Sequence, residues 1–248
     1  MARSFRHSFP VRNPLSFAIF LLAISCIISC ASGGSENQLS AQQKKNGWKL
    51  LFDGKTLNGW HLYHKGNKAS VWEAKNGELS CNPGNGKEEG DLVTDSTFEN
   101  FDLTFEWRMG DDGNSGVFIN VLESDTLPRV WFSGPEYQLL GNANRDFPVP
   151  DERSGALFGL DAQKNEAAVK PVDQWNQSRI KQVGGKTEFY LNDVLTVKED
   201  FTSQAWLDKV RASNFKTHPD FGKYTKGHIA LQDWAKGVSF RNIRVKNL

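Results

Sequence analysis

From Trp48 to the C-terminus, the chain is a series of short apolar or alternating runs separated by glycine, asparagine and aspartate. The clearest run is "FDLTFEWRM" (residues 101–109), which carries an aromatic or aliphatic side chain at every second position from Phe101 to Trp107. Successive side chains of a strand point to opposite faces, so this run predicts a strand with one buried face and one polar face. Many such runs in succession indicate an all-β sandwich or barrel.

Turn signals between the runs favour antiparallel pairing. The glycine pair in "VGGK" (183–186) joins "WNQSRIKQV" to "TEFYLN", and both glycines can take the positive φ angles of a tight hairpin. One segment differs, because "TSQAWLDKVRASNF" has a cap at Thr202 or Ser203 and apolar residues at helical spacing, which predicts one short surface helix. Strands and helices do not alternate, so a doubly wound fold is not expected. We predict a single all-β domain over residues 47–248.

The first 29 residues resemble an export signal rather than part of the fold. Three arginines and no acidic residue precede the apolar run "LSFAIFLLAISCIISC", which is too short and too early for a membrane span. The run ends in Ile-Ile-Ser-Cys30, similar to a bacterial lipobox, whose cysteine becomes the lipidated first residue of the mature chain. Cys26 is a second candidate, and an ordinary secretory signal cleaved near Ala31 or Ser32 is the alternative. The lipobox predicts a lipid anchor in the cell envelope, on the periplasmic side or at the outer-membrane surface.

Composition after this segment narrows the range of partners. Residues 30–46 have no aromatic and little aliphatic content, so we expect a flexible tether there. Beyond residue 29 the chain has 27 basic and 29 acidic residues, a balance that favours neither nucleic acid nor an anionic surface as a partner. We expect contact with the membrane only through the anchor. Cys81 is the one other cysteine of the mature chain, so no internal disulfide is predicted. Nothing in the composition indicates an oligomeric state.

Several common signatures of catalysis are missing from the sequence. It has no glycine-rich phosphate loop, no Cys or His cluster at metal spacing and no G-x-S-x-G motif. His61 and His64 are close in sequence, but a spacing of three along a strand places them on opposite faces. We therefore predict no cofactor and no structural metal, and leave the use of a divalent cation open.

Polar side chains on the strand faces remain as candidates for a binding site. Carboxylates, amides, a guanidinium and nearby indoles are groups that bind sugars, through paired hydrogen bonds and an apolar ring face. The alternative is that each polar face is the solvated outside of a sandwich. The candidates are Glu106, Arg108, Asn114, Ser115, Glu136, Gln138, Gln232, Asp233 and Trp234.

Several segments carry a resemblance to a known family. These are "LFDGKTLNGW", "GDLVTDSTFENFDLTFEWRMGDDGNSGVFIN", "GPEYQLLGN", "KPVDQWNQSRIKQVGGKTEFYLN" and "GHIALQDWAKGVSFRNIRVKNL". In this order, from Gly47 to Leu248, they are similar to the 3-keto-disaccharide hydrolases of bacteria. The resemblance implies a concanavalin-like jelly roll of two curved antiparallel sheets with a concave sugar-binding face, and a carbohydrate as the partner.

The chain departs from the family pattern at three positions. Phe189 stands where the family typically has histidine, and Asp193 stands where it has glycine. Trp234 replaces a second histidine. Two side chains suited to proton transfer or metal contact are therefore absent, which weakens the prediction of activity more than the prediction of fold.

The resemblance implies a particular route to glycoside cleavage. The ketone of a 3-keto sugar acidifies the hydrogen on C2, so a base can remove it, the enolate can expel the C1 substituent, and water then adds. Glu136 is the predicted base, and Asp233 is the predicted acid for the leaving oxygen. Arg108 and Gln138 are predicted donors to the ketone or to neighbouring hydroxyls, with Glu106 holding Arg108 in place.

The remaining candidates are predicted to bind substrate. Asn114 and Gln232 supply amides, and Trp234 supplies a ring face for stacking on a sugar, whereas Trp107 is expected in the core. Two other functions remain open from the sequence. A lipid-tethered module could bind glycan in the same groove without chemistry, or the protein could be a docking lipoprotein with a vestigial groove.

Overall fold

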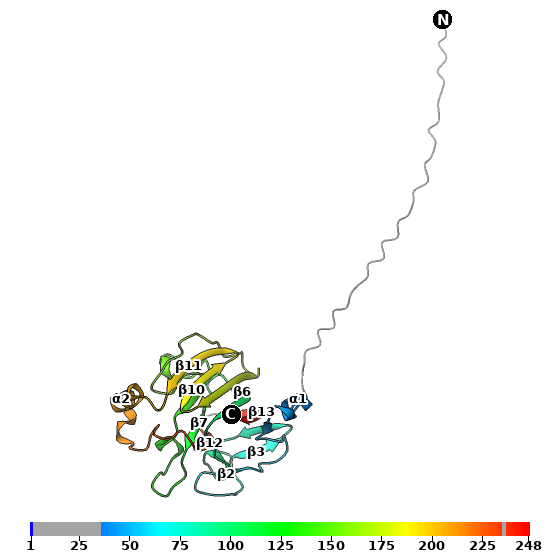
Figure 1. The fold of residues 1–248 in the computed structure, drawn as a ribbon. Coiled ribbons are helices and arrows are strands. Elements are labelled where there is room, and N and C mark those ends of the chain that lie inside the picture. Colours follow the sequence, from blue (N-terminus) through cyan, green and yellow to red (C-terminus); the bar gives the residue numbers. More distant parts are fainter. Residues whose placement is uncertain (2–35, 235–236) are drawn as a thin grey trace. The chain divides into compact units, whose positions relative to one another are not determined.

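The computed structural model describes Met1, residues 36–234 and residues 237–248. Apart from Met1, the predicted signal segment lies outside these residues, as do the lipidation site Cys30 and the first part of the tether. In the part of the chain that the structure describes, no helix is long and apolar enough to cross a membrane. The described residues from 36 onward belong to one compact unit (Figure 1).

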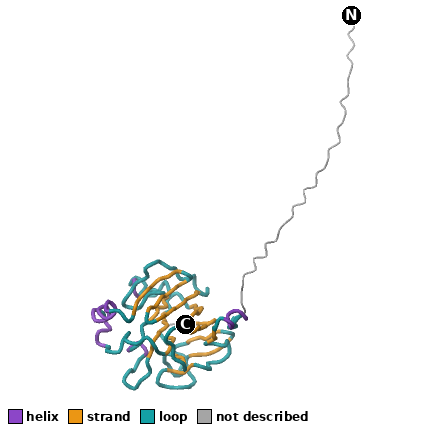
Figure 2. The backbone as a smooth tube through the Cα atoms, viewed as in Figure 1, coloured by secondary structure: helices purple, strands orange, loops and turns teal. Residues whose placement is uncertain are grey.

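The fold is a sandwich of two antiparallel sheets, as the tube in Figure 2 shows. The eight-stranded sheet has, in spatial order, β11 (Val194–Asp200), β10 (Lys186–Leu191), β9 (Asn176–Val183), β6 (Phe101–Arg108), β13 (Val238–Asn247), β4 (Glu78–Cys81) and β3 (Trp72–Lys75), and β1 (Trp48–Leu50) pairs with β13. The five-stranded sheet has β2 (Trp60–Leu62), β5 (Leu92–Thr94), β12 (His228–Leu231), β7 (Asn114–Val121) and β8 (Glu136–Leu140). The helices are α1 (Ala41–Lys45) and α2 (Gln204–Ala212), with 3-10 turns η1 (Val130–Phe132), η2 (Pro150–Glu152) and η3 (Asn214–Thr217).

The chain changes sheets repeatedly, which gives the jelly-roll connectivity. It passes from the eight-stranded to the five-stranded sheet after β1, β4, β6 and β11, and returns after β2, β5, β8 and β12. The last strand, β13, lies between β4 and β6, so the C-terminal end of the chain closes the middle of the larger sheet. The predicted all-β jelly roll of two antiparallel sheets is confirmed.

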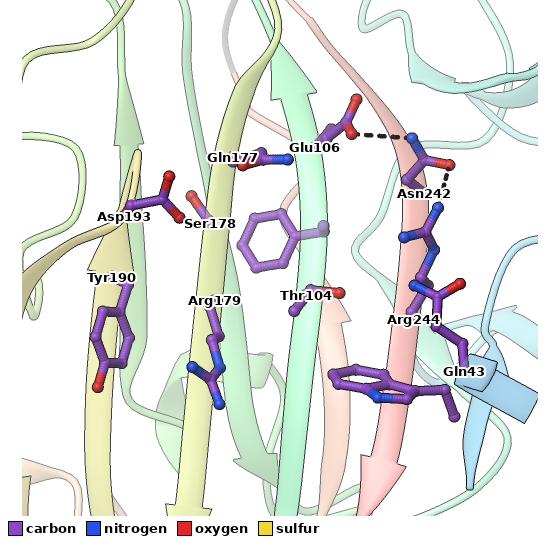
Figure 3. Close-up of a pocket in the computed structure, with 12 residues that line it drawn as sticks. Gln43, Thr104, Glu106, Gln177, Ser178, Arg179, Tyr190, Asp193, Asn242 and Arg244 are labelled. Atoms are coloured by element: carbon purple, nitrogen blue, oxygen red, sulfur yellow. Dashed lines mark hydrogen bonds between the residues drawn. The ribbon is translucent and has the colours of Figure 1, made fainter. Parts of the chain in front are cut away.

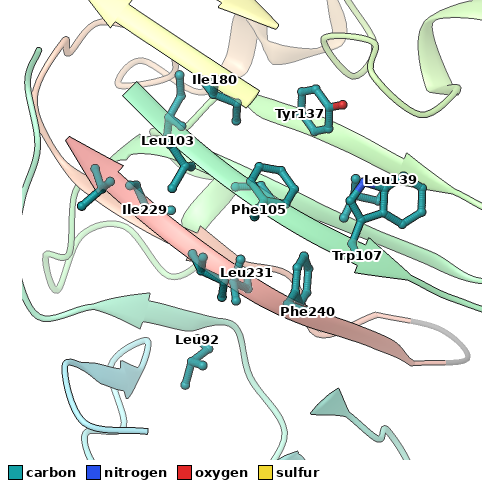
Figure 4. Packing of buried hydrophobic residues seen from close by; sticks show 14 of the residues in the cluster. Leu92, Leu103, Phe105, Trp107, Tyr137, Leu139, Ile180, Ile229, Leu231 and Phe240 are labelled. Carbon is teal, nitrogen blue, oxygen red and sulfur yellow. The ribbon is translucent and has the colours of Figure 1, made fainter. Parts of the chain in front are cut away.

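The core lies between the sheets and follows the alternation seen in the sequence. On β6, the aromatic and aliphatic side chains from Phe101 to Trp107 are buried and pack against Phe240 and Leu231 (Figure 4). Trp107 also satisfies its indole N–H, which donates to Ser178 Oγ at 2.9 Å. Burial of aromatic side chains of this size dominates core energetics, so Trp107 is a core residue, as expected.

The predicted surface helix is present as α2. Ser203 is its N-cap, and the Ser203 side chain accepts a hydrogen bond from the Trp206 backbone N–H at 3.0 Å. Trp206 is fully buried and donates its ring N–H to the Gly222 carbonyl at 2.7 Å, which attaches the helix to the sandwich.

The predicted tether is shorter than expected, because residues 36–46 fold onto the domain. Ser40 forms a capping box with Gln43 at the start of α1. Asn37 is buried and exchanges hydrogen bonds with Asn242, at 2.7 Å to the Asn242 side chain and 2.9 Å from its backbone N–H. Polar composition argued for disorder, but these residues are ordered by caps and amide pairs rather than by apolar burial.

The hairpin that joins β10 to β11 explains why glycine suits position 193, where this chain has Asp193. Asn192 and Asp193 have φ angles of 48° and 67°, the left-handed pair of a type I′ turn, in which glycine is the least strained second residue. Asp193→Gly is therefore expected to raise the free energy of unfolding by about 0.5 kcal/mol, since relief of strain exceeds the entropy that glycine adds to the unfolded chain. Chemical denaturation measures the change.

Asn192→Gly is the matched control for this turn. The Asn192 side chain accepts from the Gln177 N–H at 2.9 Å and donates to the Ala168 carbonyl at 2.9 Å and to Asn176 at 3.0 Å. Loss of these bonds should lower the stability by more than 1 kcal/mol. Equal effects of the two glycine substitutions would contradict the assignment of strain to Asp193.

Candidate functional site

A cavity of about 700 Å³ opens on the outer face of the five-stranded sheet. Its floor comes from β7, β8 and the end of β12, and its walls come from loops that follow β7, β8 and α2. On β8, Tyr137 and Leu139 face the core, so Glu136 and Gln138 face the cavity. The cavity also contains the predicted residues Asn114, Gln232, Asp233 and Trp234.

Glu136 is buried at the floor of this cavity. It has room because the facing strand carries Gly116, where an added Cβ would lie 1.9 Å from Glu136 Oε1. In the described part of the chain, Glu136 Oε1 has no hydrogen-bond partner. Burial, with a smaller contribution from the charge of Asp91, raises the pKa of Glu136 well above its ordinary value.

Two glutamines beside Glu136 also present unsatisfied oxygens. Gln138 donates its amide N–H to Asn114 Oδ1 at 3.1 Å, but Gln138 Oε1 and Gln232 Oε1 are buried and accept no hydrogen bond from any described residue. Buried polar atoms in native proteins are nearly always paired. Three unpaired acceptors in one cavity therefore mark a place where a ligand with several hydroxyl groups would complete the hydrogen bonding.

Asp91 is a second carboxyl of the cavity, and the sequence analysis did not nominate it. Asp91 Oδ1 accepts the backbone N–H of Asp233 at 3.0 Å. Burial raises the pKa of Asp91 to about 6, against the lowering effects of that hydrogen bond and of Arg129. Asp91 immediately precedes β5 in "GDLVT". A carboxylate directly before an apolar strand is the sequence feature that could have indicated it as a site residue.

Asp233 lies in the cavity as predicted, but other groups already occupy its carboxylate. Cys81 Sγ donates to Asp233 Oδ1 at 3.2 Å, and the Gly90 N–H donates to Oδ2 at 2.8 Å. These bonds hold the loop before β5 against the end of β12. Asp233 therefore positions Asp91 through its backbone N–H, and Asp91 is the better placed of the two for proton transfer.

Aromatic and basic side chains form the rim of the cavity. Trp234 is 58% exposed, which leaves its ring face available for stacking. Trp131 packs edge-on against His218, with ring centroids 4.8 Å apart. Arg129 and Arg145 also line the cavity. Sequence reasoning missed these residues, except Trp234, because they belong to irregular loops without strand periodicity.

Glu106 and Arg108 do not belong to this cavity, so the prediction that they share a groove with Glu136 is wrong. Both lie on β6 of the eight-stranded sheet. Glu106 accepts hydrogen bonds from Arg241 Nε at 2.7 Å and Asn242 Nδ2 at 2.9 Å. Arg108 donates to Glu78 at 2.7 Å rather than pairing with Glu106. Alternation along a strand indicates which side chains share a face, but not which of two sheets contains the strand.

The two histidines of the β2 region are closer than a strand would place them. His61 Nε2 lies 2.8 Å from Glu123 Oε2, and the backbone N–H of His64 donates to the same carboxylate. They converge because β2 ends at Leu62 and His64 has a φ of 59°. Among residues 36–234 and 237–248, no group of three or more His, Cys, Asp or Glu side chains could hold a metal ion.

The two missing family histidines occupy different environments. Phe189 is 1% exposed and packs in the core, with its ring centroid 5.1 Å from that of Tyr137. Phe189 does not line the cavity. Trp234 lies at the rim, where the replacement substitutes a large ring face for a titratable group.

The jelly-roll sandwich with a carboxyl-lined cavity on one sheet is similar to that of two solved structures of candidate glycosyl hydrolases. One is a candidate glycosyl hydrolase from Parabacteroides distasonis, 25% identical, with a TM-score of 0.77, covering 86% of this chain and 100% of that one. A second candidate glycosyl hydrolase from the same organism is 26% identical, with a TM-score of 0.61, covering 82% of this chain and 100% of that one.

The family is defined more narrowly by sequence. Residues 47–246 match the model of the 3-keto-alpha-glucoside-1,2-lyase-like domain. The chain is also 32% identical over 237 residues to the 3-keto-disaccharide hydrolase of Bacteroides thetaiotaomicron, a match that covers 82% of this chain and 79% of the relative. The chain therefore belongs to the 3-keto-alpha-glucoside-1,2-lyase-like family, which confirms the predicted family and the expectation of a glycoside-cleaving enzyme.

Proposed function

We propose that this enzyme cleaves 3-keto disaccharides by removing the proton on C2, eliminating the C1 substituent and adding water. The observation that carries the proposal is the pair of carboxyls that line one cavity, Glu136 and Asp91, both with pKa values raised by burial. Pairs of titratable groups whose environments separate their pKa values are typical of acid–base catalysis. The substrate class comes from the family, described as 1,2-lyase-like, and from the hydrolase relative.

The two carboxyls differ in which one ionises first. Glu136 is buried, and the negative charge of Asp91 raises its pKa further, so Asp91 loses its proton before Glu136 does. Between the two ionisations the cavity then holds an ionised Asp91 and a protonated Glu136. We assign the base to Asp91 and the acid to Glu136, which exchanges the role that sequence reasoning gave Glu136.

Each step of the proposed reaction conserves atoms and charge. Asp91 takes the hydrogen from C2, and the electron pair of the C–H bond forms an enolate with its charge on the C3 oxygen. The enolate expels the C1 substituent, whose oxygen receives the proton of Glu136. Water then gives a proton to Glu136 while its hydroxyl adds to C1, and Asp91 returns its proton to C2, so both carboxyls are again in their starting states.

Other residues of the cavity orient the sugar. Gln138 and Gln232 present the unpaired oxygens to hydroxyl groups, and Asn114 fixes the Gln138 amide. Arg129 is the cation next to Asp91 and stabilises negative charge on the C3 oxygen, the part that sequence reasoning assigned to Arg108. Trp234 stacks on a ring at the rim.

An assay that follows two signals together tests the proposal. The protein is incubated in deuterated water with a 3-keto disaccharide and, separately, with its unoxidised parent. We expect deuterium at C2 and release of monosaccharide with the keto sugar only. Release from the parent at a similar rate would indicate an ordinary glycosidase, and binding without exchange or release would indicate a lectin.

Asp91→Asn tests the assignment of the base. In the native enzyme, kcat/KM should rise with pH through an apparent pKa near 6, because ionised Asp91 is the active form. The asparagine variant should lose this limb and fall at least about 100-fold at pH 7.5. A pH profile of each protein measures both effects. A native activity that falls as the pH rises through 6 would instead assign the base to the other carboxyl.

We also propose, from the lipobox alone, that Cys30 is lipidated and that the enzyme is anchored in the cell envelope. Labelling of the expressing bacterium with an alkyne fatty acid should tag the native protein and not a Cys30→Ala variant. Equal labelling of the two proteins would assign the lipid elsewhere, and no labelling of either would favour an ordinary secretory signal.

A further inference from the structure

A second groove lies on the outer face of the eight-stranded sheet, on the other side of the core from the cavity that contains Glu136. It has a volume of about 380 Å³ and crosses β10, β9, β6 and β13 (Figure 3). Gln43 of α1 and Trp48 of β1 close one edge, and Tyr190 and Asp193 close the other. The segment that forms the first edge is held in place by the buried Asn37, so this wall is part of the folded domain.

Hydrogen bonds fix most of the polar groups in the groove before any ligand arrives. Arg179 donates two bonds to Asp102, at 2.7 Å and 2.6 Å, and its guanidinium lies 5.5 Å from the Tyr190 ring. Glu106 is held by Arg241 and Asn242. These groups therefore present donors and acceptors in a set geometry, and little side-chain entropy is lost when a ligand binds.

Arg244 is the exception, because its charge is not balanced locally. Its Nη2 donates to Asn242 Oδ1 at 3.1 Å, but its buried Nε has no partner in the described part of the chain. No salt bridge joins Arg244 to an acidic side chain of residues 36–234 or 237–248. A buried N–H without a partner is unusual on a solvated outer face, whereas in a binding groove a ligand can supply the missing acceptor.

We propose that this groove is a second binding site, for a neutral glycan, separate from the catalytic cavity. Trp48 and Tyr190 supply aromatic rings at its two edges, and the amides and guanidinium groups between them donate to hydroxyls. Glu106 and Asp193 add carboxylates that accept from hydroxyls and repel anions. The mixture of fixed donors and acceptors matches neighbouring hydroxyls of a sugar better than it matches a phosphate, a sulfate or a uronate.

The site would hold a longer glycan on one face of the enzyme while the cavity on the other face performs the cleavage. This function does not depend on the proposed reaction, because the groove shares no residue with the cavity. Binding there should persist when Glu136 is replaced, which separates failure of this inference from failure of the proposed function.

The experiment uses the full chain with Glu136→Gln on an array of neutral and acidic oligosaccharides. We expect retention of at least one neutral oligosaccharide, and a loss of at least about tenfold in affinity on adding Arg244→Gln or, separately, Gln177→Ala. Gln177 lines the groove with an exposed side chain, so its truncation leaves the fold intact. Lys186→Gln, which removes a charge from the same sheet outside the groove, and Trp234→Ala in the cavity should each leave retention unchanged.

Three results would overturn the proposal. The first is an array on which no neutral oligosaccharide is retained. The second is retention that survives both Arg244→Gln and Gln177→Ala, or that Trp234→Ala abolishes, since either would place the glycan in the catalytic cavity. The third is retention of acidic oligosaccharides only, which would mean that the unbalanced charge of Arg244 selects anions.

Discussion

Glu136→Gln is expected to lower kcat/KM on a 3-keto disaccharide by at least about 100-fold, and by up to about 10⁴-fold if proton transfer to the leaving oxygen is fully rate-limiting. Glutamine has the shape of a protonated glutamate and fits beside Gly116, but its amide does not deliver a proton to a leaving oxygen. Because the sugar contacts of Gln138 and Gln232 remain, we expect the loss mainly in kcat and only a small change in KM.

The matched control is Glu166→Gln, which removes a carboxylate from an exposed loop and should retain native kinetics. Circular dichroism of the two variants would establish that both are folded. If Glu136→Gln retained more than about a tenth of native kcat, the acid would have to be another group. In that case the burial of Glu136 would need a structural explanation.

The same substitution is expected to stabilise the protein, by an amount that grows with pH. The pKa of Glu136 is raised in the folded state, so the folded state binds this proton more tightly than the unfolded state does. The stability cost is absent below the ordinary pKa of about 4.5 and increases as the pH rises above it. Thermal melts of native protein and Glu136→Gln should therefore coincide near pH 4 and diverge by pH 8, with the variant melting higher. Equal melting temperatures at both pH values would contradict the burial of an unpaired acid.

Sequence periodicity predicted the core of this protein well but divided the polar residues between the sheets poorly. The run from Phe101 to Trp107 is buried as its alternation requires, and the resemblance placed the whole domain in the correct fold. The same alternation predicted both Glu106 and Glu136 as site residues, although they lie on the outer faces of different sheets. A period of two determines on which face of its strand a side chain lies. The sheet to which the strand belongs depends on long-range pairing.

The sequence did not indicate Asp91, the second carboxyl of the proposed catalytic pair, for a related reason. Asp91 belongs to a loop, and its raised pKa arises from burial against Asp233 and the end of β12, which lie about 140 residues away in the sequence. Asp233 was nominated because it stands in a recognisable motif. Its role is to anchor that loop through bonds to Cys81 and Gly90. The motif thus indicated the region of the site. The hydrogen bonds seen in the structure were needed to separate the role of Asp91 from that of Asp233.

Gly116→Ala should impair the enzyme although it replaces no titratable group. The added Cβ would lie 1.9 Å from Glu136 Oε1 and 2.6 Å from its carboxyl carbon, so the Glu136 side chain must leave its position. Overpacking of this kind costs about 1–3 kcal/mol of stability, and displacement of the acid should lower kcat/KM at least about tenfold. Gly110→Ala is the control, because the nearest heavy atom to its added Cβ is 4.0 Å away, an ordinary contact.

A double-mutant cycle assigns the cost of Gly116→Ala to its cause. If the clash is with Glu136 alone, Gly116→Ala should cost little stability in a Glu136→Ala background, where the carboxyl is absent. The two substitutions would then be strongly non-additive, as expected of side chains in contact. Additive losses in denaturation experiments would mean that Gly116 is required for the backbone of β7 rather than for the carboxyl. The functional importance of this glycine would then be separate from the catalytic pair.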